Sequence, residues 1–489
     1  MGIGSKWGAW VKRYSGIDRA VFFTISARLL QVVGSIGTVL LIIHFLSPVE
    51  QGYYYTLLSL AALQIVFELG FSFVILQLAA HESALLTFHS DGRIVGDAVA
   101  HARLASVLQL TVRWYCRAAI AMAVIVLPIG IAFFSGQAHT AVRVSWLGPW
   151  VAAVLAISVT FLLTPIYSFL EGCNQVLQVA RLRMMQAVIV LTMSWVAIAT
   201  GHGLYACALV NLGWIAVGVS FLIRRRRLLL GLLRFPAGED GVSWRAEIWP
   251  FQWKIAVSWL CSYFTLQLFT PILFAFRGPQ EAGRMGLTLS VVGYLPIVAL
   301  CWITTKAVPF GQLIKLGRID ELDALFFRTL KQSLSMVALL AVGCCAVLAG
   351  VELFVPRTAA RMESPGIFVL LLLTAVSSFV VQSLAVYLRS FKKEPYLVQS
   401  IAVSGITLGA ILPAVPRWGG EAVAILYFVA SGVVGLLWAV IIFLRRRSVQ
   451  TKLSPGNRSR ISTMPSCAAA VYSYGGGAGE ESGADRGVE

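Results

Sequence analysis

Long apolar runs, separated by short polar segments, recur along most of this chain. The runs are continuous rather than alternating, and many reach the length of about 18 residues that a helix needs to cross a bilayer. Only helices and closed barrels satisfy every backbone polar group in lipid, and continuous runs favour helices over barrel strands. The pattern therefore predicts an all-α, polytopic membrane protein.

The runs predict about 12 transmembrane helices in two six-helix bundles. The expected spans are 21–45, 53–80, 106–134, 148–170, 184–200, 203–223, 255–276, 285–308, 332–356, 366–388, 396–414 and 420–444. Six runs on each side of a central polar connection are common among transporters whose halves rock about a midplane site. We expect, in order, a cytoplasmic N-terminus over 1–20, a bundle over 21–223, a basic cytoplasmic linker over 224–254, a bundle over 255–447 and a disordered cytoplasmic tail over 448–489. Residues 311–331 should hold a short amphipathic helix.

Basic residues fall almost entirely on one side of these spans. The side that bears the N-terminus receives 32 of the 39 Lys and Arg residues and the other side receives 6. Cytoplasmic loops carry an excess of Lys and Arg, so we expect both termini in the cytoplasm. The same loop charges account for the net charge of +17, and no aromatic-basic module interrupts the spans, so we expect no nucleic-acid partner.

The sequence lacks the motifs that would indicate an enzyme or a metal site. It contains no CxxC pair, GxxxxGK[ST], HExxH or GxSxG, and no predicted loop on the exterior side is long. We therefore expect no ATP-driven engine, no metal, no cofactor and no catalytic activity.

Arg28 lies inside the first apolar run, about 10 Å from its start at about 1.5 Å per residue. A guanidinium stays charged, and its insertion into hydrocarbon costs at least about 2.5 kcal/mol. Two interpretations remain open. The side chain either climbs back to the headgroups, or it faces a cavity, where its planar fork binds phosphate or carboxylate.

Other charged residues within spans are also candidates. Arg113 and Arg117 are spaced i, i+4 on one face of the third span, beside Trp114. They either anchor the helix at the membrane interface or add two cations to a cytoplasm-facing vestibule. Glu68 either pairs with Arg28 or a neighbour, or takes up a proton during transport.

Three stretches resemble the start of polysaccharide and lipid-linked oligosaccharide flippases (Wzx-like) of the multidrug/oligosaccharidyl-lipid/polysaccharide exporter superfamily. They are Ala27–Gln31, Leu46–Tyr55, which reads LSPVEQGYYY, and Glu68–Phe71. The resemblance covers roughly the first 80 residues. It implies two six-helix bundles around a central cavity that is lined with cations, alternating access, and a location in the bacterial inner membrane.

The expected function is translocation of an oligosaccharide linked to undecaprenyl diphosphate, for surface polysaccharide synthesis. Expected substrate-binding residues are Arg28, Arg113, Arg117 and Gln31, and Glu68 is the candidate for coupling to protons or sodium. Expected partners are this lipid, membrane lipids and other polysaccharide assembly proteins. One alternative is a drug or organic-cation antiporter of the same superfamily, which would need acids in its cavity. Another is a membrane glycan polymerase or ligase, which would need a large external loop.

Overall fold

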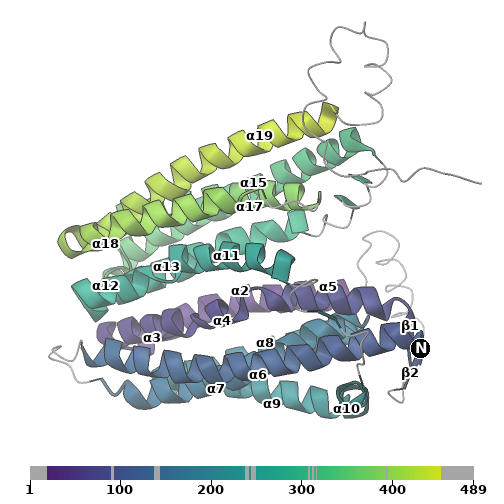
Figure 1. Ribbon diagram of the computed structural model, residues 1–489. Helices are drawn as coiled ribbons and strands as arrows, with labels where there is room; N and C mark the ends of the chain where they lie inside the picture. The colour runs from purple at the N-terminus through teal and green to yellow at the C-terminus, as the bar shows by residue number, and fades with distance from the viewer. Residues whose placement is uncertain are drawn as a thin grey trace, which may run out of the picture.

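The computed structural model describes residues 19–89, 93–136, 144–236, 242–243, 249–304, 306, 309–310, 313–314, 317–391 and 395–452. Over these residues the chain forms long helices that run in roughly the same direction, in two layers (Figure 1). Helices from the first half of the sequence form the purple and blue layer, and helices from the second half form the teal, green and yellow layer. Of the expected N-terminal segment 1–20 and tail 448–489, residues 1–18 and 453–489 lie outside the described residues, while residues 19–20 and 448–452 are helical.

The first layer contains nine α-helices, one 3-10 turn and a small hairpin among the described residues. They are α2 (Arg19–Phe45), α3 (Pro48–Ala61), α4 (Gln64–Glu68), α5 (Phe71–Ser83), β1 (Leu86–Phe88), β2 (Ile94–Gly96), α6 (Ala98–Ser135), α7 (Leu147–Gly172), α8 (Val176–Ala199), η1 (Gly203–Tyr205), α9 (Ala206–Ile223) and α10 (Arg226–Arg234). The strands β1 and β2 pair antiparallel, with Thr87 opposite Val95. This hairpin was not expected from the apolar pattern, because it lies between two spans and its two strands bury few apolar side chains.

The second layer consists of helices in the described part of residues 249–452. They are α11 (Trp249–Leu266), α12 (Phe269–Arg277), α13 (Pro279–Thr304), α15 (Ile319–Phe354), α16 (Pro356–Ala359), α17 (Pro365–Arg389), α18 (Leu397–Tyr427), η3 (Phe428–Gly435) and α19 (Leu436–Lys452). The amphipathic segment expected as a separate helix over 311–331 is, from Ile319 onward, the first part of α15. Its apolar residues Leu322 and Phe326 are fully buried, so packing within the layer makes the helix continuous.

Eight helical stretches in the described part of the chain are long and apolar enough to cross a membrane. The all-α, polytopic membrane class is therefore supported directly. One of these stretches, Leu397–Ser448, contains a break at Gly419, where φ is 56° and ψ is −133°. This break divides α18 into two helices where we expected the boundary between two spans.

The second expected span, 53–80, is not one helix. Leu69 and Gly70 both adopt left-handed backbone conformations, with φ of 52° and 68°, and they end α4 and begin α5. A non-glycine residue rarely adopts this conformation, and it persists where the surrounding structure imposes it. The apolar run predicted one continuous helix here because it carried no signal of this break.

Glycines allow α2 to lie directly against α8. A Cβ on Gly34 would overlap the Leu191 side chain, and a Cβ on Gly37 would lie 2.6 Å from Trp195 Cζ2. The Trp195 indole also donates a hydrogen bond to the Thr38 hydroxyl at 3.0 Å. Small residues of this kind are what lets membrane helices approach closely.

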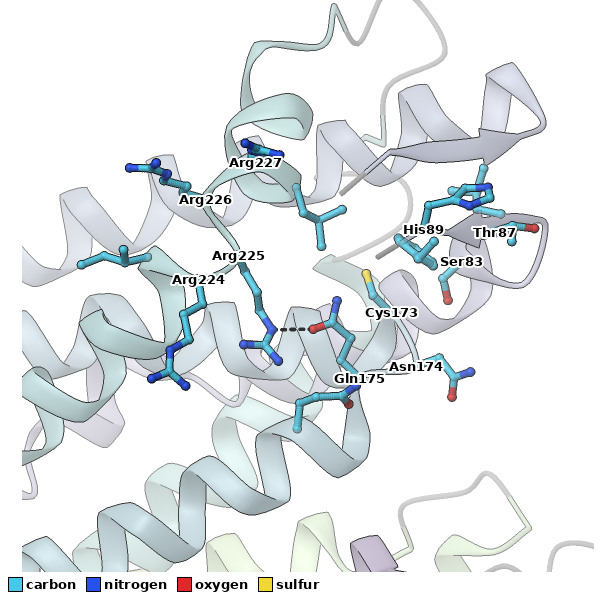
Figure 2. Close-up of a pocket in the computed structure, with 15 residues that line it drawn as sticks. Ser83, Thr87, His89, Cys173, Asn174, Gln175, Arg224, Arg225, Arg226 and Arg227 are labelled. Carbon is cyan, nitrogen blue, oxygen red and sulfur yellow. Dashed lines mark hydrogen bonds between the residues drawn. The ribbon is translucent and has the colours of Figure 1, made fainter. Parts of the chain in front are cut away.

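One end of the bundle, which we call the hairpin end, carries β1, β2, α10 and the end of α19 (Figure 1). At this end the turn between α9 and α10 presents four consecutive arginines, Arg224–Arg227 (Figure 2). The end that carries the starts of α3 and α13 is the opposite end.

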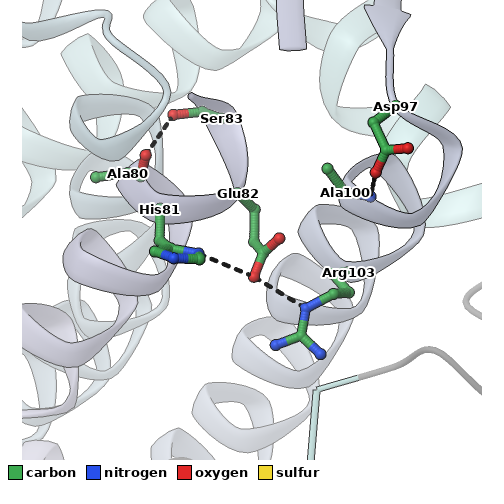
Figure 3. A network of polar contacts seen from close by, with 7 residues as sticks. All are labelled: Ala80, His81, Glu82, Ser83, Asp97, Ala100 and Arg103. Carbon is green, nitrogen blue, oxygen red and sulfur yellow. Dashed lines mark hydrogen bonds and ion pairs between the residues drawn. The ribbon is translucent and has the colours of Figure 1, made fainter. Parts of the chain in front are cut away.

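An ion pair fastens each layer internally near the hairpin end. In the first layer the buried Glu82 of α5 accepts a bond from Arg103 Nε of α6 at 2.9 Å (Figure 3). In the second, the buried Asp323 of α15 accepts bonds from Arg447 Nε at 2.8 Å and from the Tyr387 hydroxyl at 2.5 Å. Neither network joins the two layers.

Candidate functional site

A cavity of about 800 Å³ lies where α3 of the first layer meets the second layer. Its walls come from α3, α11, α12, α13, α17 and α18. Pro296 interrupts α13 along this wall, and a Cβ added to Gly293, one turn earlier, would meet no atom within 4 Å. Only tertiary packing could assemble this cavity, because its walls come from segments between residues 55 and 427.

The cavity is uncharged over its described lining, where polar side chains stand among a larger share of apolar surface. Hydroxyl and amide groups face it from five helices, and no Asp, Glu, Lys or Arg is among the lining residues that the structure describes. These polar residues are Tyr55, Ser59, Gln267, Thr270, Ser290, Tyr294, Thr304, Ser378, Gln382 and Tyr427. Such a surface offers hydrogen bonds without attracting or repelling ions, which suits a neutral, hydroxyl-rich ligand.

The two layers meet tightly at the opposite end, in a seam between α3 and α13. A Cβ on Gly52 would overlap the carbonyl oxygen of Pro279, and one on Gly283 would lie 2.9 Å from the Gly52 nitrogen. The Gln51 side-chain amide crosses the seam and donates to the carbonyls of Gly283 at 2.8 Å and Arg361 at 3.1 Å. Closing this end therefore depends on two backbones in direct contact.

The stretch Leu46–Tyr55, singled out in the sequence, builds the first-layer side of this seam. Ser47 caps α3 by accepting a bond from the Glu50 backbone N–H, while the Glu50 carboxylate accepts one from the Ser47 N–H at 2.8 Å. This reciprocal cap starts α3 at Pro48 and so fixes the position of Gln51 and Gly52. The guanidinium of Arg361 reaches back across the seam and donates to the carbonyls of Ile43 and Leu46.

A group of carboxylates lies beside this seam, and the sequence pattern did not indicate it. Glu363, between α16 and α17, is 8% exposed, and its Oε1 has no hydrogen-bond partner in the structure. Glu281 Oε1 accepts a bond from the Gly420 N–H at 2.6 Å, just after the break at Gly419. Burial and the nearby carboxylates of Glu281 and Glu421 raise the pKa of Glu363 to about 7, against the opposing charge of Arg284.

The residues predicted from the first span lie on α2. The side chain of Arg28 falls outside the described part of the structure. Gln31, one turn further along α2, is exposed. Gln31 is not among the described lining of the neutral cavity.

Arg113 and Arg117 are exposed on α6. Their face of the helix continues into Ile120 and Val124, which are 67% and 66% exposed. The two arginines are therefore on a surface shared with apolar side chains, and the structure does not bring them to the described lining of the neutral cavity.

Glu68 ends α4 immediately before the left-handed residues that break the second span. It is partly buried and lies close to the Ser72 hydroxyl at the start of α5. That hydroxyl in turn lies 3.1 Å from the phenol oxygen of Tyr115 in α6. An acid at the break of a discontinuous membrane helix, beside two hydroxyls, is a suitable place to bind a proton or a small cation.

No protein-family model matches this sequence, and no curated protein matches it. Similar solved structures exist. A multidrug resistance MATE family transporter of the MOP superfamily in its inward-facing conformation shares 13% identity, with a TM-score of 0.50 over 86% of this chain and 99% of that chain. Its outward-facing conformation gives 13% identity and a TM-score of 0.51 over 89% and 96%. A MATE structure in the straight conformation gives 13% identity and a TM-score of 0.51 over the same shares.

These likenesses extend over nearly the full length of the MATE structures. They agree with the long apolar helices of this chain. The chain therefore has the all-α membrane fold that these MATE structures have.

Proposed function

We propose that this protein is a flippase that moves a lipid diphosphate-linked oligosaccharide across the bacterial inner membrane for surface polysaccharide synthesis, by alternating access. The observation that carries this proposal is the uncharged cavity of about 800 Å³ at the junction of the two layers, where hydroxyl and amide groups stand among apolar side chains. Sugars present many hydroxyls and little charge, and such a lining can bond them in several orientations. The lipid tail would remain in the bilayer between the two halves.

The diphosphate needs a cation, and the neutral cavity supplies none from its described lining. We assign this role to Arg28, with Gln31 one turn away on α2, because a guanidinium fork matches phosphate oxygens. Arg113 and Arg117 would add positive charge along α6 where the headgroup approaches from the membrane interface. Glu68 would couple transport to a proton or sodium ion.

The membrane arrangement belongs to the same proposal. Twelve crossings follow if the pieces α3 to α5 form one crossing, α11 and α12 form another, and the break at Gly419 separates the last two. The bundles over 21–223 and 255–447 would then rock against each other, with the hairpin end and both termini in the cytoplasm, as the distribution of Lys and Arg indicates. The tight seam at the opposite end corresponds to a state closed toward the outside.

The two alternatives fit the described residues less well. A drug or organic-cation antiporter needs acids in its cavity, and the described lining has none. A glycan polymerase or ligase needs a sizeable external domain, and the segments that join helices at the opposite end are short where the structure describes them.

The test measures export of lipid-linked glycan in cells that lack their own flippase. Gln267→Leu and Gln382→Leu remove amides from the cavity, while Gln332→Leu makes the same change at an exposed position on α15. We expect export to fall at least about tenfold in the cavity variants at equal membrane levels, since each lost bond to a buried polar partner costs about 1–3 kcal/mol. Unchanged export in both cavity variants would remove the glycan assignment.

A second arm of the test addresses the headgroup. Arg28→Ala should abolish export and Arg28→Lys should restore part of it, because lysine keeps the charge but loses the bidentate geometry. Normal export with alanine would exclude Arg28 as the diphosphate ligand. Loss of resistance to organic cations, with export unchanged, would favour the antiporter instead.

A further inference from the structure

A second large pocket lies in the first layer at the hairpin end, away from the neutral cavity. It has a volume of about 1140 Å³ and is formed by three segments: the end of α5 with β1, the turn between α7 and α8, and the turn between α9 and α10 (Figure 2). The third segment contributes Arg224–Arg227, and no Asp or Glu is among the described lining residues. The pocket therefore has a strongly positive rim.

An adjoining groove gives this basic pocket an apolar extension. A cavity of about 540 Å³ shares Gln178, Arg224 and Arg225 with it and runs along α8 and α9. The groove is walled by apolar side chains that include Met185 and Val217, and Arg181 lies at its basic end. A basic head joined to an apolar channel on the surface of a membrane helix pair has the outline of one phospholipid.

The arginines of the pocket are positioned differently from one another. Arg225 is held in place, because its Nε donates to Gln175 Oε1 at 2.7 Å and its guanidinium lies 3.7 Å from the Phe221 ring centroid. Arg224, Arg226 and Arg227 are exposed, and no carboxylate of the described residues forms an ion pair with them. Burial, and secondarily the charge of Arg224, lower the pKa of Arg225. An anion bound here would therefore reduce the repulsion between the positive charges of Arg224 and Arg225.

The pocket lies at the start of α8 and the end of α9, two helices that are long and apolar enough to cross a membrane, which places it at the depth of lipid headgroups. The helix α10 packs Leu228, Leu229 and Leu232 against the first layer and exposes its arginines. The Gln109 amide of α6 holds the end of α10 by donating to the Phe235 carbonyl at 2.7 Å. In Figure 1, α9 and α10 lie at the edge of the first layer that is farthest from the second layer, so this site is separate from the junction of the halves.

We propose that this pocket and groove bind one resident anionic phospholipid of the leaflet at the hairpin end. Its phosphate contacts the guanidinium groups of the α9–α10 turn, and an acyl chain follows the groove between α8 and α9. The charge of the rim favours an anionic over a zwitterionic lipid, and the apolar groove favours a lipid over a soluble phosphate. The site does not depend on which substrate the protein transports, because it lies outside the proposed path.

The experiment measures lipid binding to the purified full-length protein by native mass spectrometry. Phosphatidylglycerol, phosphatidylcholine and soluble pyrophosphate are titrated separately. The test variant is Arg224→Gln/Arg226→Gln, and the matched control is Arg445→Gln/Arg446→Gln, which removes two exposed arginines from the same end of the second layer. We expect the affinity for phosphatidylglycerol to fall at least about tenfold in the test variant and to stay unchanged in the control.

Two further variants separate the head from the tail of the lipid. Arg224→Lys/Arg226→Lys keeps the charge but loses the guanidinium geometry, so it should bind phosphatidylglycerol more tightly than the glutamine variant and less tightly than the natural protein. Met185→Asp places a charge in the exposed groove and should weaken phosphatidylglycerol binding without changing pyrophosphate binding. Equal binding of the two phospholipids, equal losses in the test and control variants, or pyrophosphate binding as tight as that of phosphatidylglycerol would each overturn the proposal.

Discussion

The carboxyl group of Glu363 should make the stability of this protein depend on pH, and Glu363→Gln should remove that dependence. Glu363 is 8% exposed beside the seam that joins the two layers, and its pKa is raised from 4.5 to about 7. Because burial is the largest cause, the folded protein favours the neutral acid, and the charged form is left without adequate partners.

The size of the effect follows from linkage between proton binding and folding. A pKa difference of about 2.5 between the folded and unfolded protein, at about 1.4 kcal/mol for each unit, gives about 3.5 kcal/mol. Since the folded-state pKa is the higher one, the stabilisation is fully present below pH of about 4.5, falls as the pH rises, and is lost above about 7. Opening the seam would expose the charged Glu363 carboxylate to water. Alkaline pH should therefore also favour separation of the layers at this end.

The assay is thermal unfolding of the purified protein in detergent between pH of about 5 and about 8.5, a range that brackets the raised pKa. The melting temperature of the natural protein should fall by several degrees across this range, and that of Glu363→Gln should fall much less. Glu352→Gln is the matched control, because Glu352 is an exposed carboxyl near the end of α15. If the natural protein and Glu363→Gln give melting curves with the same pH dependence, the burial of a neutral acid beside the seam is refuted.

Three further predictions concern the seam, the second layer and coupling. Gly52→Val should prevent the seam from closing, because its Cβ would overlap the Pro279 carbonyl. A cysteine at position 51 should then react faster with a membrane-impermeant maleimide, whereas Gly293→Val, at a position where an added Cβ meets no atom within 4 Å, should leave the rate unchanged. Asp323→Asn should destabilise the protein by about 2 kcal/mol in denaturant unfolding, because it leaves the partly buried Arg447 without its counterion, while Asp320→Asn at an exposed position of the same helix should have little effect. Glu68→Gln should make glycan export in membrane vesicles insensitive to an imposed proton or sodium gradient, and an undiminished response to both gradients would exclude Glu68 as the coupling residue.

The sequence identified most membrane helices because hydrophobicity is a local property. A helix in lipid satisfies its own backbone, so an apolar run of sufficient length specifies it without help from distant residues. The two helix breaks, at Leu69 and at Gly419, differed in how visible they were in the sequence. The boundary at Gly419 coincided with a Pro- and Gly-rich stretch that the apolar pattern marked, whereas Leu69 is an apolar residue inside an apolar run.

The candidate sites were only partly accessible from sequence. Glu68 and Arg28 were identified because placing a charged side chain inside a membrane span costs free energy whatever its orientation. The neutral cavity gave no such signal, since Gln267, Ser290 and Gln382 are ordinary polar residues until six helices bring them to one surface. Likewise, the stretch Leu46–Tyr55 was recognised by resemblance alone.

What the amino-acid sequence determined by itself was the membrane class, the positions of most helices and the uneven distribution of basic residues. The tertiary structure alone decided that Gln51 bonds to the Gly283 carbonyl, 232 positions away, and that Glu363 is buried beside this seam. It also joined Arg224–Arg227 to an apolar groove. The physical reason is that apolar transfer energy is set residue by residue, whereas a seam, a cavity or a perturbed acid is set by which distant groups share the same space.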